Sequence, residues 1–164
     1  MAELFNFTKY LREIVGKPLK DLGFKQKGGW FSRETPLLVE KIYFQRSQFN
    51  MQGFKSRFYL NLYYDYGKGL TGGVRLHYPN VQTCPSFACA SDWQYSSEEE
   101  LKQVLSVAVT EIITNALPYF SNISNVFKNK KEYNTDEKRV AEINRIGFNL
   151  SEKYNKIKYD VENI

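Results

Sequence analysis

Residues 57–66 read RFYLNLYYDY, and this stretch decides the fold class. Its even positions carry phenylalanine, leucine and tyrosine, whereas its odd positions carry arginine, tyrosine, asparagine and aspartate. A period of two is typical of a β-strand that packs one face on a core and leaves the other face more exposed to solvent. The stretch therefore predicts a strand, the clearest one in the chain, and the segments on either side of it supply further strands of a sheet.

Further candidate strands lie on both sides of this one. They lie at residues 30–34, 37–47, 74–78 and 92–95. The connections are short, which favours an antiparallel meander with one packed face. Residues 25–29 and 67–73 are rich in glycine, and we expect them to form a loop and a turn.

Helical periodicity marks the two ends of the chain. Apolar residues recur every three or four positions over residues 4–22, with an interruption at Pro18 and a glycine cap at Gly23. A second helix is expected from Ser97 to Leu117, where Ser97 and Glu100 have capping-box spacing and Pro118 ends the stripe.

We expect a polar turn over residues 121–134 and a last helix to about Lys158, capped by Thr135 or Asn134. The whole pattern predicts one α+β domain over residues 1–164. It has an antiparallel sheet of four to five strands, an N-terminal helix and two C-terminal helices.

Composition narrows the class of protein. The chain of 164 residues is 42% hydrophobic and 16% aromatic, which excludes global disorder. Glutamate, lysine or asparagine interrupts its apolar stretches, so no membrane span is expected. The first residues lack the basic-then-apolar pattern of a secretion signal, and only two cysteines occur; together these predict a cytoplasmic protein without a disulfide framework.

The formal charge of +5 is uneven along the chain. Residues 1–55 hold ten Lys/Arg and five Asp/Glu, for a net +5, whereas residues 56–100 are net −2 and residues 101–164 net +2. A basic bias of this kind either keeps a surface solvated or attracts phosphates or an acidic protein.

Patterns that suggest catalysis are incomplete. Residues 67–72 match G-x-G-x-x-G, but a strand-like segment follows where a dinucleotide site needs a helix. Cys84, Cys89 and His77 do not complete a zinc set, and nothing fixes the separation of Glu40 and Asp65. We therefore expect no catalytic residue, metal or cofactor; an enzyme with a cleft near His77 and Asp65 is the third and weakest hypothesis.

The odd positions of the two longest predicted strands form the candidate site. They are Lys41, Tyr43, Gln45, Tyr59, Asn61, Tyr63 and Asp65. Tyrosines interleaved with amides and charges are typical of protein-binding surfaces. The same residues can stack bases, with Lys41, Arg33 and Arg46 or Arg57 near the phosphates, or a second helical layer can cover them.

Several segments resemble the bacterial domain-of-unknown-function 4304 family. They are Leu22-Gly23-Phe24-Lys25, Trp30-Phe31, Phe44-Gln45-Arg46-Ser47, Phe58-Tyr59-Leu60-Asn61-Leu62, the segment around Trp93 and Ala116-Leu117-Pro118. The likeness covers roughly residues 10–125, and Tyr63 departs from a glycine that is usual in the family. The resemblance implies a small intracellular α+β domain and assigns no catalytic residue.

These observations lead to one functional expectation and one alternative. We expect a non-enzymatic protein-binding module, in concrete form an immunity-type protein that neutralises a toxin through its tyrosine-rich sheet face. Because the chain is basic, such a partner needs an acidic surface. The alternative is a protein that binds single-stranded nucleic acid with the same face.

Overall fold

An antiparallel sheet organises the structure, a computed structural model that describes residues 6–48, 50, 55–67, 71–79 and 93–162. Its strands are β1 (Lys25–Lys27), β2 (Trp30–Glu34), β3 (Val39–Arg46), β4 (Ser56–Asp65), β5 (Thr71–Leu76) and β6 (Trp93–Tyr95). The spatial order is β1-β2-β3-β4-β5, and β6 pairs with the first residues of β4. The ten-residue strand β4 pairs with three of the described strands, β3, β5 and β6.

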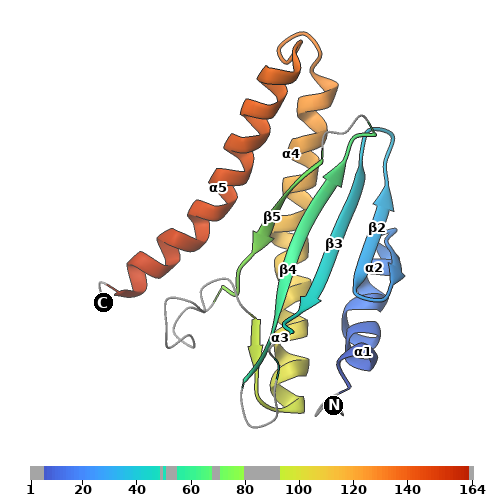
Figure 1. The fold of residues 1–164 in the computed structure, drawn as a ribbon, viewed down its shortest axis with the longest axis vertical. Helices are drawn as coiled ribbons and strands as arrows, with labels where there is room; N and C mark the ends of the chain where they lie inside the picture. Colours follow the sequence, from blue (N-terminus) through green and yellow to red (C-terminus); the bar gives the residue numbers. More distant parts are fainter. Residues whose placement is uncertain (1–5, 49, 51–54, 68–70, 80–92, 163–164) are drawn as a thin grey trace.

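The helices lie before and after the sheet in the sequence. They are α1 (Phe7–Tyr10), the π-helical segment η1 (Leu11–Gly16), α2 (Lys17–Asp21), α3 (Glu98–Glu111), the π-helical segment η4 (Ile112–Ala116), α4 (Leu117–Lys128) and α5 (Asp136–Glu162). In Figure 1, α3 and α4 form one long rod behind the strands, and α5 returns beside β5. The predicted fold class is confirmed.

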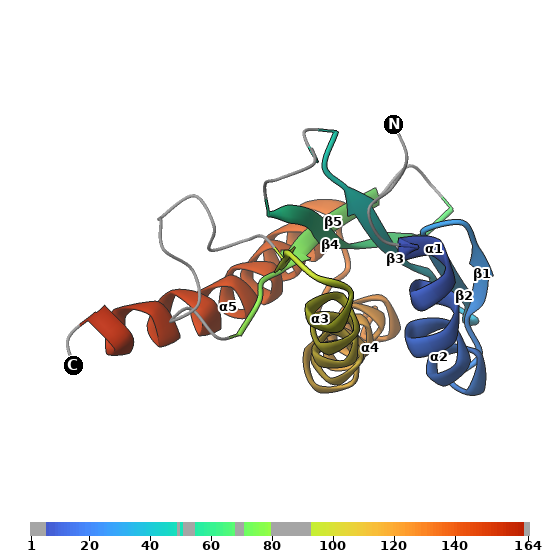
Figure 2. The same ribbon diagram turned by 90° about the horizontal axis from the view of Figure 1, so that it is seen from below.

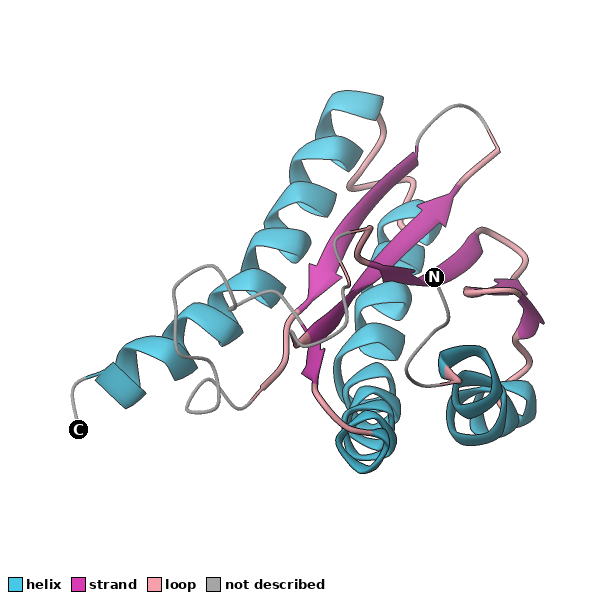
Figure 3. Ribbon diagram, turned by 60° about the horizontal axis from the view of Figure 1, so that its bottom comes forward, coloured by secondary structure: helices cyan, strands magenta, loops and turns pink. Residues whose placement is uncertain are grey.

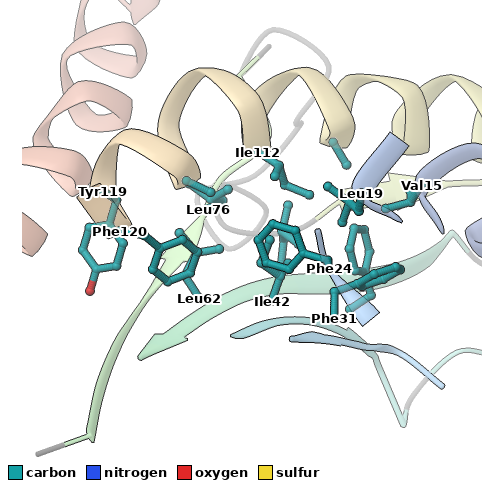
Figure 4. Packing of buried hydrophobic residues seen from close by; sticks show 14 of the residues in the cluster. Val15, Leu19, Phe24, Phe31, Ile42, Leu62, Leu76, Ile112, Tyr119 and Phe120 are labelled. Atoms are coloured by element: carbon teal, nitrogen blue, oxygen red, sulfur yellow. The ribbon is translucent and has the colours of Figure 1, made fainter. Parts of the chain in front are cut away.

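The core lies between the helices and the inner face of the sheet, which carries Phe31, Ile42, Phe44, Phe58, Leu60, Leu62, Tyr64 and Leu76. Figure 4 shows Ile42 and Leu62 from the strands meeting Ile112 and Phe120 from the long rod. All four side chains are fully buried. Burial of the even positions on β3 and β4 explains why these strands alternate.

Two glycine-rich segments differ from their predicted structure. Residues 25–29 are not only a loop, because Lys25–Lys27 pairs with β2 around the turn at Gly28, whose φ is +60°. Residues 72 and 73 belong to β5 and not to a turn. A Cβ on Gly72 would lie 2.6 Å from the Tyr64 hydroxyl, so the tyrosine rings of β4 occupy the space that side chains on β5 would need.

We expect Gly73→Ala to lower the free energy of unfolding by about 3 kcal/mol, because overpacked contacts force the backbone to move. Its Cβ would lie 2.4 Å from the carbonyl oxygen of Leu62 on the paired strand. Gly28→Ala is the matched control, since nothing lies within 4 Å of its Cβ and only the positive φ is strained. Gly28→Ala should lower the free energy of unfolding by about 1 kcal/mol. Urea unfolding followed by circular dichroism measures both, and equal losses would contradict the steric account.

Both helical prolines sit inside longer helices. Pro18 follows η1 and Pro118 follows η4, each within the first positions of the next α-helix. A proline lacks the N–H that an α-helix needs, and a wider π-turn shifts the hydrogen bonding where it occurs. The prediction that Pro118 ends its helix is therefore wrong, and the predicted polar turn shrinks because α4 continues to Lys128.

Helix ends follow the predicted chemistry with one change. Thr135 accepts a hydrogen bond from the Lys138 N–H, so it caps α5. The Ser97 hydroxyl accepts from the Glu100 N–H at 3.1 Å, as the capping box predicts. The Glu100 carboxylate, however, accepts from the backbone and hydroxyl of Ser96 instead of the Ser97 N–H.

Because the helix passes through Pro118, residues Glu98–Lys128 form a rod of 31 residues with a window of mean hydropathy 1.3. By length and composition alone this rod is able to cross a membrane. The interrupting polar residues therefore do not exclude a membrane span here, contrary to the sequence-based expectation. One such helix is weak evidence, since core helices of soluble proteins meet the same test. Its apolar side packs on the sheet, as Figure 4 shows for Ile112 and Phe120.

Candidate functional site

The face of the sheet that points away from the core, which we call the outer face, contains all seven predicted site residues. Strand register places them in cross-strand rows. One row is Lys27, Trp30, Tyr43, Asn61 and Arg75, the next is Lys25, Ser32, Lys41, Tyr63 and Gly73, and the flanking pairs are Gln45 with Tyr59 and Val39 with Asp65. The odd positions of β3 and β4 thus share one face of the sheet, as predicted.

No described helix covers the outer face. In Figure 2, α3 and α4 lie below β3, β4 and β5, α1 and α2 lie on the inner side of β1 and β2, and α5 runs along the other side. Figure 3 shows the same separation of strands from helices. The contacts of α5 agree with this view. Gly147 of α5 approaches Val74, which lies on the inner face of β5 opposite Leu62. For the part of the chain that the structure describes, the alternative of a second helical layer is wrong.

An aromatic cluster occupies the middle of the outer face. The rings of Trp30 and Tyr43 stack with centroids 4.1 Å apart and planes 6° apart, and the Trp30 ring lies 5.7 Å from that of Tyr63. Trp30 remains 39% exposed, whereas Tyr43 and Tyr63 are half-buried. The sequence analysis placed Trp30 on a strand but missed it as a site residue, because the register between β2 and β3 decides which face it joins.

A polar network adjoins this cluster. Asn61 is 5% exposed, donates to the Gln45 side-chain oxygen at 3.0 Å and accepts from Arg75 Nε at 3.0 Å. The Arg75 guanidinium lies over the Tyr59 ring at 4.4 Å from its centroid. Asn61 is therefore a buried support that fixes Gln45 and Arg75, and those two carry the polar surface. Arg75 is a second residue that the sequence analysis missed.

The outer face is basic. Its cationic side chains are Lys25, Lys27, Lys41, Arg57 and Arg75, against the acidic Glu34 and Asp65, which gives five to two and a net +3. The short strand β1 contributes two of these lysines, both exposed. Three of the five cations, Lys25, Lys27 and Lys41, come from the basic first third of the sequence, and Arg57 and Arg75 come from the segment that follows it.

Two of the arginines considered for phosphate contacts lie elsewhere. Arg33 is on the inner-face parity of β2 and binds Glu40, which is 4% exposed, at 2.7 Å. Arg46 has inner-face parity on β3, and its guanidinium lies 5.4 Å from the centroid of the Phe7 ring. Only Arg57 of the three shares the face with the tyrosines.

The residues of the enzymatic hypothesis are not brought together. Asp65 pairs with Thr71 at the start of β5, and the Asp65 carboxylate accepts a hydrogen bond from the Gly67 N–H at 2.8 Å. His77 follows the other end of β5, and its ring stacks on Tyr154. Glu40 and Asp65 have opposite parity and face opposite sides of the sheet. Neither pair forms a shared acid–base site.

Glycine, cysteine and metal chemistry add no site. Gly67 follows β4 and Gly72 lies within β5, so G-x-G-x-x-G spans a hairpin and no helix follows it; residues 68–70 lie outside the described ranges. Cys84 and Cys89 also lie outside them. Among the described residues no group of three metal-ligating side chains occurs.

A family model covers most of the chain. Residues 15–122 match the family model described as "Domain of unknown function (DUF4304)". Neither a curated protein nor a solved structure matches the chain. The matched region contains the whole outer face, so the candidate site lies within the family domain.

Proposed function

Because the chain belongs to the DUF4304 family, whose function is unknown, we propose a function from the outer face: the protein is a non-enzymatic module that binds an acidic protein surface. In its concrete form it is an immunity-type protein whose partner is a cytoplasmic toxin. The observation that carries the proposal is an aromatic, basic sheet face that no described helix covers.

The composition of the face suits protein binding. Large aromatic side chains and arginine dominate the energetic centres of protein interfaces. Here Trp30, Tyr43 and Tyr63 pack against one another, and Asn61 holds Gln45 and Arg75 from beneath. A partner therefore meets side chains that are already ordered, which reduces the entropy lost on binding.

Ring geometry favours a protein over single-stranded nucleic acid. Bases bind by stacking on open ring faces. One face of Tyr43 is taken by Trp30, and Arg75 lies over the ring of Tyr59. Side chains of the protein therefore already occupy a face of two tyrosine rings, which leaves fewer open faces on which bases can stack.

Charge selects the kind of partner. A face of net +3 attracts a carboxylate-rich surface and repels a second copy of itself. We therefore expect a hetero-complex whose association rate falls with added salt, and not a dimer through the outer face.

A site-specific crosslinking experiment tests the proposal. A photoreactive amino acid replaces Trp30 in one full-length variant and Phe148 in another, since Phe148 is 64% exposed on α5 and away from the sheet face. After irradiation in cells of the source organism, we expect a protein adduct from position 30 and none of the same identity from position 148. The partner is then purified and its affinity measured.

Tyr43→Ala is expected to weaken that complex by tenfold or more, because truncating a central aromatic residue removes over about 1.4 kcal/mol. Phe148→Ala should leave the affinity unchanged. A partner bound equally by both variants, or no adduct at position 30, contradicts the proposal. Tight binding of oligo(dT) or oligo(U) that Tyr43→Ala abolishes would replace it with the nucleic-acid alternative.

A further inference from the structure

A groove separate from the outer face lies between α4 and α5. The two helices meet near the turn that joins them and diverge toward the C-terminus (Figure 1). The space between them has a volume of about 390 Å³, within the usual range of ligand sites. It is on the helical side of the sheet, so a ligand there does not compete with a partner on the outer face.

Carboxamide side chains line this groove from both helices. Asn122 and Asn125 come from α4, Asn149 comes from α5, and Ile146 and Leu150 form apolar parts of the wall. None of these three asparagines makes a side-chain hydrogen bond within the described part of the chain. Each therefore presents one free N–H donor group and one free oxygen acceptor.

The charged groups of the groove are already paired. Glu142 binds Arg145 on α5, and the Lys153 ammonium donates to Asn115 at 3.2 Å. At the turn, the Asn129 amide donates to Glu132 at 2.8 Å. Two acidic and two basic residues leave the lining without net charge. A phosphate or another anion therefore gains little binding free energy in this groove. A ligand is recognised there mainly through hydrogen bonds with uncharged side chains.

We propose that this groove binds an extended peptide segment through its main chain. A peptide group carries one N–H donor and one oxygen acceptor, and a carboxamide carries an NH₂ donor group and one oxygen acceptor, so asparagines match a peptide group in both directions. In an extended segment alternate side chains point to opposite sides, which lets one set contact Ile146 and Leu150 while the other faces solvent. The segment belongs to a protein partner and is uncharged where it meets the groove.

Peptide selection on the full-length protein tests this inference. A displayed library of unstructured 12-residue peptides is selected against the wild type, with the variant Asn122→Ala/Asn125→Ala/Asn149→Ala as the negative target. These asparagines are exposed, so the variant should fold, and its circular dichroism spectrum and urea midpoint verify this. We expect peptides enriched on the wild type whose affinity falls at least tenfold on the variant.

Chemical modification then separates main-chain from side-chain recognition. Single N-methylation of a selected peptide should weaken binding tenfold or more at two or more positions, and the affinity should be unchanged between low and high salt. Enrichment equal on both targets, or affinity lost with salt, overturns the proposal. Binding of an oligosaccharide array that the triple variant abolishes, with no enriched peptide, also overturns it. Trp30→Ala is the control, because loss of outer-face binding should leave the selected peptides bound.

Discussion

Trp93→Ala is expected to lower the free energy of unfolding by about 5 kcal/mol, at the upper end of losses for buried aromatic residues. The Trp93 side chain is fully buried on β6, its ring stacks on Phe58 with centroids 5.8 Å apart, and Tyr78 meets it edge-on at 5.2 Å. The indole N–H also donates to the Leu76 carbonyl oxygen at 3.0 Å. One side chain therefore links β6 to both β4 and β5.

Trp93→Phe separates the two contributions. It keeps an aromatic ring against Phe58 and leaves the Leu76 carbonyl without its donor, so we expect a loss of about 1–3 kcal/mol. Urea unfolding monitored by circular dichroism gives both values. A Trp93→Phe loss as large as that of Trp93→Ala would show that the hydrogen bond, and not the packing, dominates. Phe148→Ala is the exposed control and should change stability by less than about 1 kcal/mol, because the Phe148 side chain is 64% exposed.

Local periodicity carries the parts of the fold that the sequence predicts well. The alternation of Phe58, Leu60 and Leu62 with polar residues follows from burial of one face of β4, so it locates the strand to within a residue. Residues 30–34 were predicted with the bounds that β2 has. These features depend on near neighbours in the sequence, which a single chain displays directly.

Features that depend on distant partners escape such a prediction. Pro118 reads as a helix end, yet the apolar stripe on both sides of it packs on one sheet and keeps the rod continuous through η4. Gly72 and Gly73 read as a turn, yet the Tyr63 and Tyr64 side chains require small residues opposite them. In each case the deciding contact comes from another strand or layer.

The same distinction holds for the candidate site. Parity along β3 and β4 places Tyr43 and Tyr63 on one face, which the structure confirms. Trp30 joins them only through the β2–β3 register, and the burial of Asn61 depends on Arg75 from a fourth strand. Whether a helix covers the face is a property of the chain's path, which no local pattern encodes.

Arg33→Met is expected to lower the free energy of unfolding by about 3–5 kcal/mol at neutral pH, because it leaves a buried carboxylate without its partner. Glu40 is 4% exposed, and Arg33 binds its Oε2 through Nε and a terminal nitrogen, both at 2.7 Å. Arg33 also donates to the Leu22 carbonyl oxygen at 2.8 Å. The arginine therefore joins the two strands to the end of α2.

The reverse substitution should be mild. Burial raises the pKa of the Glu40 carboxyl above its ordinary value, and the Arg33 guanidinium only partly opposes this effect. Desolvation of the charge thus outweighs its attraction to Arg33, so Glu40→Gln removes an unfavourable charge together with a favourable contact. We expect it to change stability by less than about 1 kcal/mol.

The pH dependence follows from the same raised pKa. The folded chain holds the Glu40 proton more tightly than the unfolded chain, so this contribution to stability is complete below the unfolded-state pKa and is lost as the pH rises through the folded-state pKa. Arg33→Met removes the opposing guanidinium and raises that pKa further. Its loss of stability should therefore be largest at neutral pH and shrink in acid. Glu40→Gln should show the opposite trend, because the variant lacks the group that stabilises the wild type as the pH falls.

A double-mutant cycle completes the argument. Arg33→Met/Glu40→Gln contains no unpaired carboxylate, so it should recover most of the stability that Arg33→Met loses. The remaining deficit measures the Leu22 carbonyl and the contact of the guanidinium with the Phe24 ring, 4.6 Å from its centroid. Urea midpoints of the four proteins, taken from mildly acidic to neutral pH, provide the cycle. Equal losses from Arg33→Met and Glu40→Gln would show that attraction between the charges, and not burial of the carboxylate, dominates at this site.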